Sequence, residues 1–212
     1  MVEAQHVAAT MKLVDDAAEQ DLLERLLESS KPPRARGTAH LHYLLSTPFR
    51  YAPRRPGSRF RDRDDPGVFY AAQGVRTACM ELGHWRWRFL MDAPALGELA
   101  PLPFTAFAVR IATRAVDLRR PPFDRDAAAW RDPDDYARTQ AFARTAREAG
   151  VGAVRYASVR DATPAWCIAL LTPEGFASPQ PEPGEQTWWL RVTPRQALWK
   201  RDRESHAWTA PA

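Results

Sequence analysis

The chain has 212 residues, of which 45% are hydrophobic, and its 30 Lys+Arg against 26 Asp+Glu give a net charge of +4. This length and apolar content fit one large domain or two small ones, and they exclude a disordered or fibrous chain. The 2 cysteines exclude a disulfide scaffold or a cysteine-rich zinc module, and no uncharged apolar run is long enough for a membrane-spanning helix.

The first third of the chain predicts a helix, a strand and a long loop. Residues 12–29 repeat leucine and alanine at helical spacing, and two prolines soon after end the helix. We expect this helix to pack back on the domain, with contact to a partner as the alternative. The run 40–46 has the composition of a strand, and the charged, proline-rich segment 52–67 predicts a long loop or a pair of short strands.

The middle of the chain predicts a long helix between short strands. Residues 68–72 form an apolar run typical of a buried strand, and helical periodicity extends over 75–92. Further strands are expected at 104–111 and 115–118. The apolar face of the helix is expected at Ala78, Leu82, Trp85 and Phe89.

The second half adds one more helix and three strands. Asp132-Pro133 opens a helix through 134–149, and Gly150 ends it. We expect strands at 153–156, 166–171 and 187–193, with loops at 158–165 and 177–186. Because strands and helices follow one another without a regular βαβ pattern, the sequence favours a single α+β domain over a doubly wound parallel sheet.

Charged side chains give the first functional hints. Only three of the basic residues are lysines, so 27 are arginines. Either nucleotide composition sets this number, or some arginines bind a phosphate-bearing ligand, since guanidinium matches phosphate bidentately. Glu81 is expected at the edge of an apolar helix face, where a carboxylate must be paired, solvated or functional. An ordinary salt bridge to Arg88 or to another arginine is the alternative.

Four sequence features then occur in order along the chain. They are Arg59-Phe60, the run Gly67–Ala72 (GVFYAA), the run Thr77–Glu81 (TACME), and, after a helix that a glycine ends, Tyr156–Arg160 (YASVR). Together they resemble the RES-domain family over residues 40–172. The charged stretch Arg61–Asp65 departs from the family pattern, which often has Gly-Arg-Trp-Asn here, and leaves open how a substrate is held on that side.

The resemblance implies a fold like that of ADP-ribosyltransferases, a split mixed sheet with flanking helices around a cleft that accepts NAD. RES proteins are typically toxins of bacterial toxin–antitoxin pairs that cleave the nicotinamide–ribose bond of NAD. NAD would then be the substrate, no metal would be needed, and the partner would be an antitoxin that carries a DNA-binding domain. We expect an N-terminal helical extension at 1–38, a catalytic domain at 39–195 and a C-terminal tail at 196–212.

The resemblance also assigns roles to residues. The family's Arg, Tyr, Glu and Ser correspond by motif to Arg59, Tyr70, Glu81 and Ser158. Glu81 would stabilise the oxocarbenium-like ribose or hold its hydroxyls, as carboxylates do in glycosidases. Arg59 would bind a pyrophosphate or ribose-side oxygen, and Tyr70 would stack on the nicotinamide or hydrogen-bond to it. Ser158 would anchor the nicotinamide amide or orient Glu81.

Each assignment has a structural alternative. Tyr70 can be a core aromatic residue, Ser158 the cap of a turn, and Arg59 one more surface arginine. The pair Arg50-Tyr51 is a second arginine–aromatic pair that can take over part of the role of Arg59-Phe60.

Other functions stay open at this point. Mono-ADP-ribosylation of a protein would use the same cleft with another acceptor. The pI of about 9.4 and the run His84–Phe89 (HWRWRF) suggest nucleic-acid binding, which the interspersed aspartates count against. A third hypothesis is an interaction protein that has lost its activity. Because the first residues lack the apolar segment of a secretory signal, we expect a cytoplasmic protein. We also expect no membrane partner, since no apolar run could span a bilayer, and no direct nucleic-acid partner. A homodimer is left open.

Overall fold

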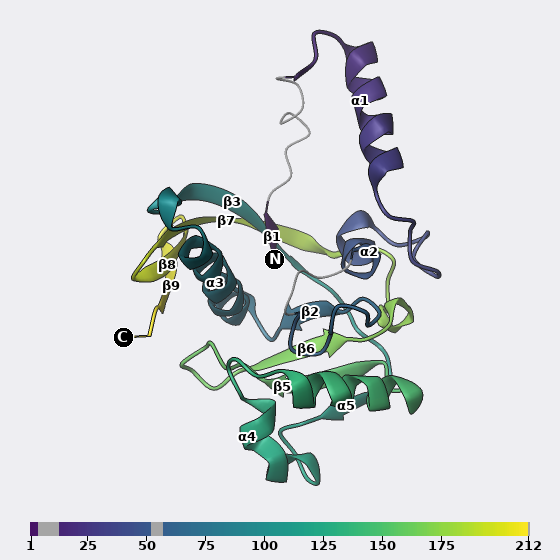
Figure 1. Ribbon diagram of the computed structural model, residues 1–212, viewed down its shortest axis with the longest axis vertical. Coiled ribbons are helices and arrows are strands. Elements are labelled where there is room, and N and C mark those ends of the chain that lie inside the picture. Colours follow the sequence, from purple (N-terminus) through teal and green to yellow (C-terminus); the bar gives the residue numbers. More distant parts are fainter. Residues whose placement is uncertain (4–12, 52–56, 212) are drawn as a thin grey trace.

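The computed structural model describes residues 1–3, 13–51 and 57–211, which form two sheets with helices against them (Figure 1). Sheet 1 is antiparallel throughout, and its strands follow the order β1 (Val2–Glu3), β3 (Leu99–Ala108), β7 (Glu182–Thr193), β8 (Gln196–Arg201) and β9 (Glu204–Thr209). Sheet 2 has the order β2 (Phe69–Ala72), β6 (Trp166–Leu170), β5 (Ala153–Ala157) and β4 (Ala115–Asp117). Because β4 is parallel to β5 and the other pairs are antiparallel, sheet 2 is mixed, and the α+β prediction is confirmed.

Sheet 1 packs against helix α3 (Val75–Asp92), whose bounds agree with the prediction. Alternate residues of β7 point toward the helix and are buried, as a half-covered strand requires. The predicted apolar face of α3 is wrong, because Trp85 and Phe89 are 42% and 44% exposed. The buried face instead carries Cys79, Met80 and Gly83, small or flexible residues that let the helix approach the large rings of sheet 1.

Sheet 2 is covered on both faces. Helix α5 (Ala137–Glu148) packs on one face through Ala143 and Ala146. It begins later than predicted, because the Asp132 carboxylate accepts from the N–H groups of the next turn rather than capping the helix directly. At its end, Gly150 has a φ of +67°. This is the left-handed conformation in which glycine commonly ends a helix.

The opposite face of sheet 2 meets helix α2 (Tyr43–Arg50), where the sequence predicted a strand at 40–46. The prediction is wrong because the apolar residues Leu41, Leu45 and Phe49 follow one another every four residues, which is a helical stripe. His42 caps the helix by accepting a hydrogen bond from the Leu44 N–H.

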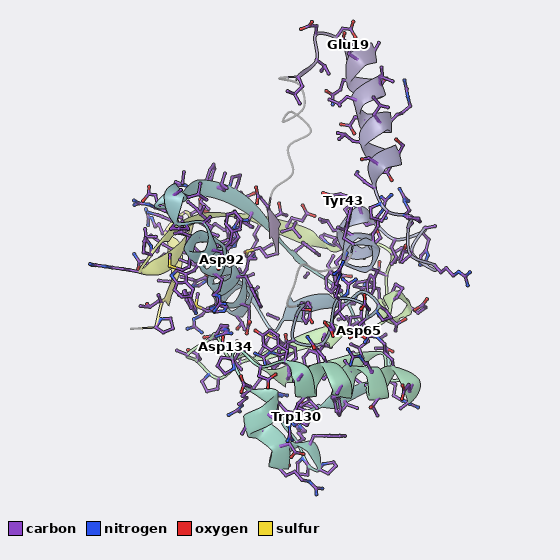
Figure 2. All side chains as sticks on the ribbon, in the orientation of Figure 1. Glu19, Tyr43, Asp65, Asp92, Trp130 and Asp134 are labelled. Carbon is purple, nitrogen blue, oxygen red and sulfur yellow. The ribbon has the colours of Figure 1, made fainter. Side chains whose placement is uncertain are left out.

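Helix α1 (Ala17–Ser30) projects away from the two sheets, with Glu19 in its outer turn (Figures 1 and 2). None of its residues is buried, so the expectation that it packs back on the domain is wrong. Its inner end is held by Arg50, which donates to Glu28 and to the Pro32 carbonyl.

The segment expected to be a C-terminal tail belongs to sheet 1. Strands β8 and β9 follow β7, and they place Trp199 and Trp208 in the core against α3. Strand β7 also begins inside the loop predicted at 177–186. The remaining elements are the short helices α4 (Ala127–Trp130), η3 (Pro94–Leu96), η4 (Phe123–Asp126) and η5 (Pro173–Gly175). Of the helices in the described ranges, none has the length and apolarity needed to cross a bilayer.

Candidate active site

Arg59 and Phe60 lie at the centre of a tight turn that the backbone groups of Ser58 and Arg61 close with two hydrogen bonds of 2.7 and 3.1 Å. Tyr70, on β2, holds this turn. Its hydroxyl accepts from the Phe60 N–H at 2.9 Å and lies 2.8 Å from Ser58 Oγ. Burial raises the pKa of the Tyr70 phenol. The GVFYAA strand therefore fixes the Arg59-Phe60 turn through a neutral hydroxyl.

The guanidinium of Arg59 is buried, with 7% of the residue exposed. Its Nη1 donates to the carbonyls of Trp130 and Asp132 at 3.0 and 2.9 Å. The guanidinium carbon lies 4.8 Å from the centroid of the Tyr136 ring. Within the described ranges, no carboxylate forms an ion pair with Arg59, and neither Nε nor Nη2 has an acceptor. Backbone N–H groups, and to a smaller extent the charge of Arg59, lower the pKa of Asp132, but this carboxylate forms no ion pair with Arg59. The free donors of the buried guanidinium therefore fit an anionic ligand.

Glu81 lies on α3 and is partly buried. Its Oε1 accepts from Ser158 Oγ at 2.5 Å and from the Cys167 thiol at 3.8 Å. Burial, together with the charge of Glu81, raises the pKa of Cys167, so that thiol remains a donor. Arg88, the partner suggested by the sequence, lies 4.0 Å from Asp134 instead. No arginine in the described part of the chain pairs with Glu81, and its Oε2 has no donor there.

Ser158 follows β5 and belongs to the loop that leads to β6. Its hydroxyl oxygen accepts the N–H groups of Asp161 at 3.1 Å and Arg160 at 3.4 Å, while its proton goes to Glu81. Ser158 is thus both a turn cap and a partner of the carboxylate. The predicted roles of cap and orienting residue are compatible in one side chain.

The buried Tyr156, on β5, is a neighbour of several of these residues. Its ring meets Phe60 edge-on at 4.8 Å. Burial raises the pKa of Tyr156 well above its ordinary range; Glu81 and Tyr70 act in the same direction, and Arg59 opposes them. Three of the four predicted site residues thus affect the pKa of this phenol. The four come from a turn, a strand, a helix and a loop to one region of the fold.

His84 lies one helical turn after Glu81 and is 4% exposed. Its ring packs against Trp208 at 5.1 Å, and its Nδ1 has no hydrogen-bond partner among the residues described. Burial, together with the charges of the nearby Arg160, Arg88 and Arg59, lowers the pKa of His84 to about 4. His84 is therefore a neutral neighbour of the site at physiological pH.

Arg50 and Tyr51 are not brought to this group. The contacts of Arg50 are with Glu28, Pro32 and the Tyr51 ring at 6.0 Å, at the base of α1. Part of the long loop that separates this pair from Arg59, residues 52–56, lies outside the described residues.

A cavity of about 590 Å³ lies elsewhere in the molecule. Its lining includes Phe49, Gly67, Arg147 and Gly152, and none of the four predicted site residues. In the HWRWRF run, Trp85 and Arg88 are exposed, whereas Trp87 and Arg86 are engaged in packing. Trp87 donates to the Pro194 carbonyl, and Arg86 lies over Phe104 and 3.6 Å from Glu3.

The sequence model of the RES domain matches residues 31–193. The chain belongs to the RES-domain family. The match extends the resemblance beyond 40–172 at both ends, and it contains the four predicted site residues in the order that the motifs require. A search among curated proteins gave no match.

Three residues of this RES domain's site were not assigned from the sequence. Cys167 donates to Glu81, and Thr77 and Asp161 form a buried contact beside it. Thr77 was visible as the first residue of the TACME run, and Asp161 directly follows YASVR. Their roles were not predictable because the contact joins segments 84 residues apart.

Proposed function

We propose that this RES-domain protein cleaves the bond between nicotinamide and ribose in NAD, and that it acts as a toxin that a cognate antitoxin neutralises. One observation carries the proposal. In a chain with 27 arginines, Glu81 has no arginine partner and the buried Arg59 has no carboxylate partner, within the ranges that the structure describes. The two unpaired charges match a ligand in which an anionic pyrophosphate is joined through a ribose to a cationic nicotinamide ring, as in NAD.

Glu81 supplies the electrostatic part of the chemistry. When the C–N bond breaks, its electron pair goes to the pyridinium nitrogen, so nicotinamide leaves as the neutral base and the positive charge stays on the ribose. A fixed carboxylate stabilises that charge without any reorganisation. Ser158 and Cys167 both bind Oε1, which leaves Oε2 for the ribose. Nicotinamide is a good leaving group as the neutral base, so the reaction needs no second carboxylic acid.

Arg59 binds the pyrophosphate through the donors that its protein contacts leave free. The hydroxyl of Tyr70 is already used by Ser58 and Phe60, so it positions the Arg59 turn, while the ring edge remains for the ligand. Ser158 orients Glu81 rather than binding the nicotinamide amide, since its proton is committed. The likeness to the ADP-ribosyltransferase cleft is part of this proposal.

The test is the release of free nicotinamide from NAD by the purified protein. We expect turnover by the wild type and by Glu185→Gln, an exposed glutamate changed in the same way. Glu81→Gln should lower kcat by about 100-fold or more, the scale of losing a preorganised electrostatic group. Equal nicotinamide release by the wild type and Glu81→Gln contradicts the proposal.

The second product identifies the acceptor. Free ADP-ribose indicates hydrolysis, its phosphorylated form in phosphate buffer indicates phosphorolysis, and label retained on protein indicates mono-ADP-ribosylation. In cells, induced expression should deplete NAD, and co-expression of a neighbouring DNA-binding antitoxin should prevent the depletion.

A further inference from the structure

Asp161 has a fully buried side chain in the loop between β5 and β6. Its carboxylate accepts from Thr77 Oγ1 at 2.9 Å and from the Thr163 N–H at 3.0 Å, and it pairs with Arg76. Arg76 and Thr77 belong to the first turn of α3. The carboxylate therefore ties the loop to the helix that carries Glu81.

A second contact joins the same loop and helix one turn further on. Thr77 and Glu81 are four residues apart and so lie on one face of α3. On the loop, Ser158 bonds to Glu81 while Asp161 bonds to Thr77. The two contacts therefore lie side by side between the same loop and helix.

The proton of Ser158 depends on this arrangement. A serine hydroxyl has one proton to donate and two lone pairs to accept with. The Asp161 N–H, at 3.1 Å, and the Arg160 N–H, at 3.4 Å, occupy the acceptor side. The proton is thereby left for Glu81 Oε1 at 2.5 Å.

We propose that Asp161 is a positioning residue of the active site. Its carboxylate binds Arg76 and Thr77, and this holds the Asp161 N–H within hydrogen-bond distance of Ser158 Oγ. Ser158 therefore remains a hydrogen-bond donor to Glu81. Asp161 itself touches neither substrate nor reacting atoms. This inference rests on the proposed function, because its main readout is the cleavage of NAD.

The first test compares Asp161→Asn with Thr77→Val and Thr77→Ser. Asp161→Asn removes the charge and one acceptor oxygen of the buried contact, and Thr77→Val removes its hydroxyl donor. We expect kcat to fall about tenfold in both, the scale of coupling between neighbouring groups, with KM nearly unchanged. Thr77→Ser keeps the hydroxyl and should restore kcat. Asp117→Asn is the matched control, because Asp117 also binds an arginine but lies on β4.

A double-mutant cycle separates positioning from a general structural effect. If Asp161 acts through Ser158, Asp161→Asn should lower kcat in the wild type but not further in a Ser158→Ala background. Equal loss in both backgrounds, or a wild-type kcat in Asp161→Asn, overturns the inference. The Thr77 variants carry the same comparison if Asp161→Asn does not fold.

Amide hydrogen exchange gives a readout that does not depend on NAD. Exchange of the amides at 158–163 should be faster in Asp161→Asn and Thr77→Val than in the wild type, Thr77→Ser and Asp117→Asn. Unchanged exchange overturns the inference. Faster exchange in a protein whose wild type releases no nicotinamide supports the positioning contact and overturns only the proposed function.

Discussion

Ser158 Oγ donates a hydrogen bond of 2.5 Å to Glu81 Oε1, although 77 residues separate them in the sequence. The bond joins the loop after β5 to α3, and it is the contact around which the predicted site is organised. A carboxylate held by a hydroxyl and a thiol, rather than by an arginine, keeps its negative charge available to a ligand.

Replacement of Ser158 by alanine should lower kcat for NAD cleavage by about tenfold or more, since it removes a charge-assisted hydrogen bond of the order of 2 kcal/mol from Glu81. The measurement is steady-state nicotinamide release. Ser205→Ala, an exposed serine on β9, is the control and should match the wild type. An active Ser158→Ala variant would show that Glu81 needs no partner.

Replacement of Arg59 by lysine should raise KM for NAD about tenfold, because one ammonium group cannot hold two carbonyls and also bind a phosphate bidentately. Arg50→Lys should leave KM unchanged, since Arg50 is bound to Glu28 and Pro32 at the base of α1. Kinetics with varied NAD distinguish the two arginines. A larger effect from Arg50→Lys would make Arg50 the principal ligand residue.

Much of this arrangement was predictable where local signals agree with tertiary packing. The bounds of α3, the strands β2, β5 and β6, and the glycine after α5 follow from short-range periodicity and from glycine's freedom at positive φ. The approach of Glu81 to Ser158 could not be predicted from any local pattern, because 77 residues separate them. Only the resemblance to the family implied it.

The failures have a common physical cause in packing between distant segments. The short run 40–46 fits a strand and a helix equally well, and the contact of Leu45 and Phe49 with sheet 2 decides for the helix. The buried face of α3 is set by Trp199 and Trp208, from strands that the sequence analysis treated as a tail. Asp161 was missed because its partners are on α3.

The stability of the protein should fall as the pH decreases from 6.5 to about 4, the ordinary and lowered pKa values of His84. In that window the unfolded chain takes up a proton that the folded chain does not, so the free energy of unfolding decreases. Urea unfolding at several pH values measures the slope, and His84→Gln should flatten it. The pKa of Glu28 is lowered from 4.5 to about 2, so Glu28 affects the free energy of unfolding mainly below pH 4.5, at the lower end of this window. An equally steep slope in His84→Gln would rule out His84 as its source.

Replacement of Trp208 by alanine should lower the free energy of unfolding by about 3–5 kcal/mol, since it empties a large volume beneath α3. Trp189→Ala, on the outer face of the same sheet and 51% exposed, should cost less than about 1 kcal/mol. Urea denaturation measures both. Similar losses in the two variants would mean that the hairpin of β8 and β9 does not support the helix.

The packing of α3 on β8 and β9 has a consequence for the order of events during synthesis. The helix carrying Glu81 is translated more than a hundred residues before Trp199 and Trp208, which form its packing surface. During synthesis, α3 therefore emerges from the ribosome before part of its packing surface exists, and the core beneath it is complete only once the β8–β9 hairpin has emerged. A chain interrupted before that hairpin contains every residue of the family motifs and yet lacks the support that would align them.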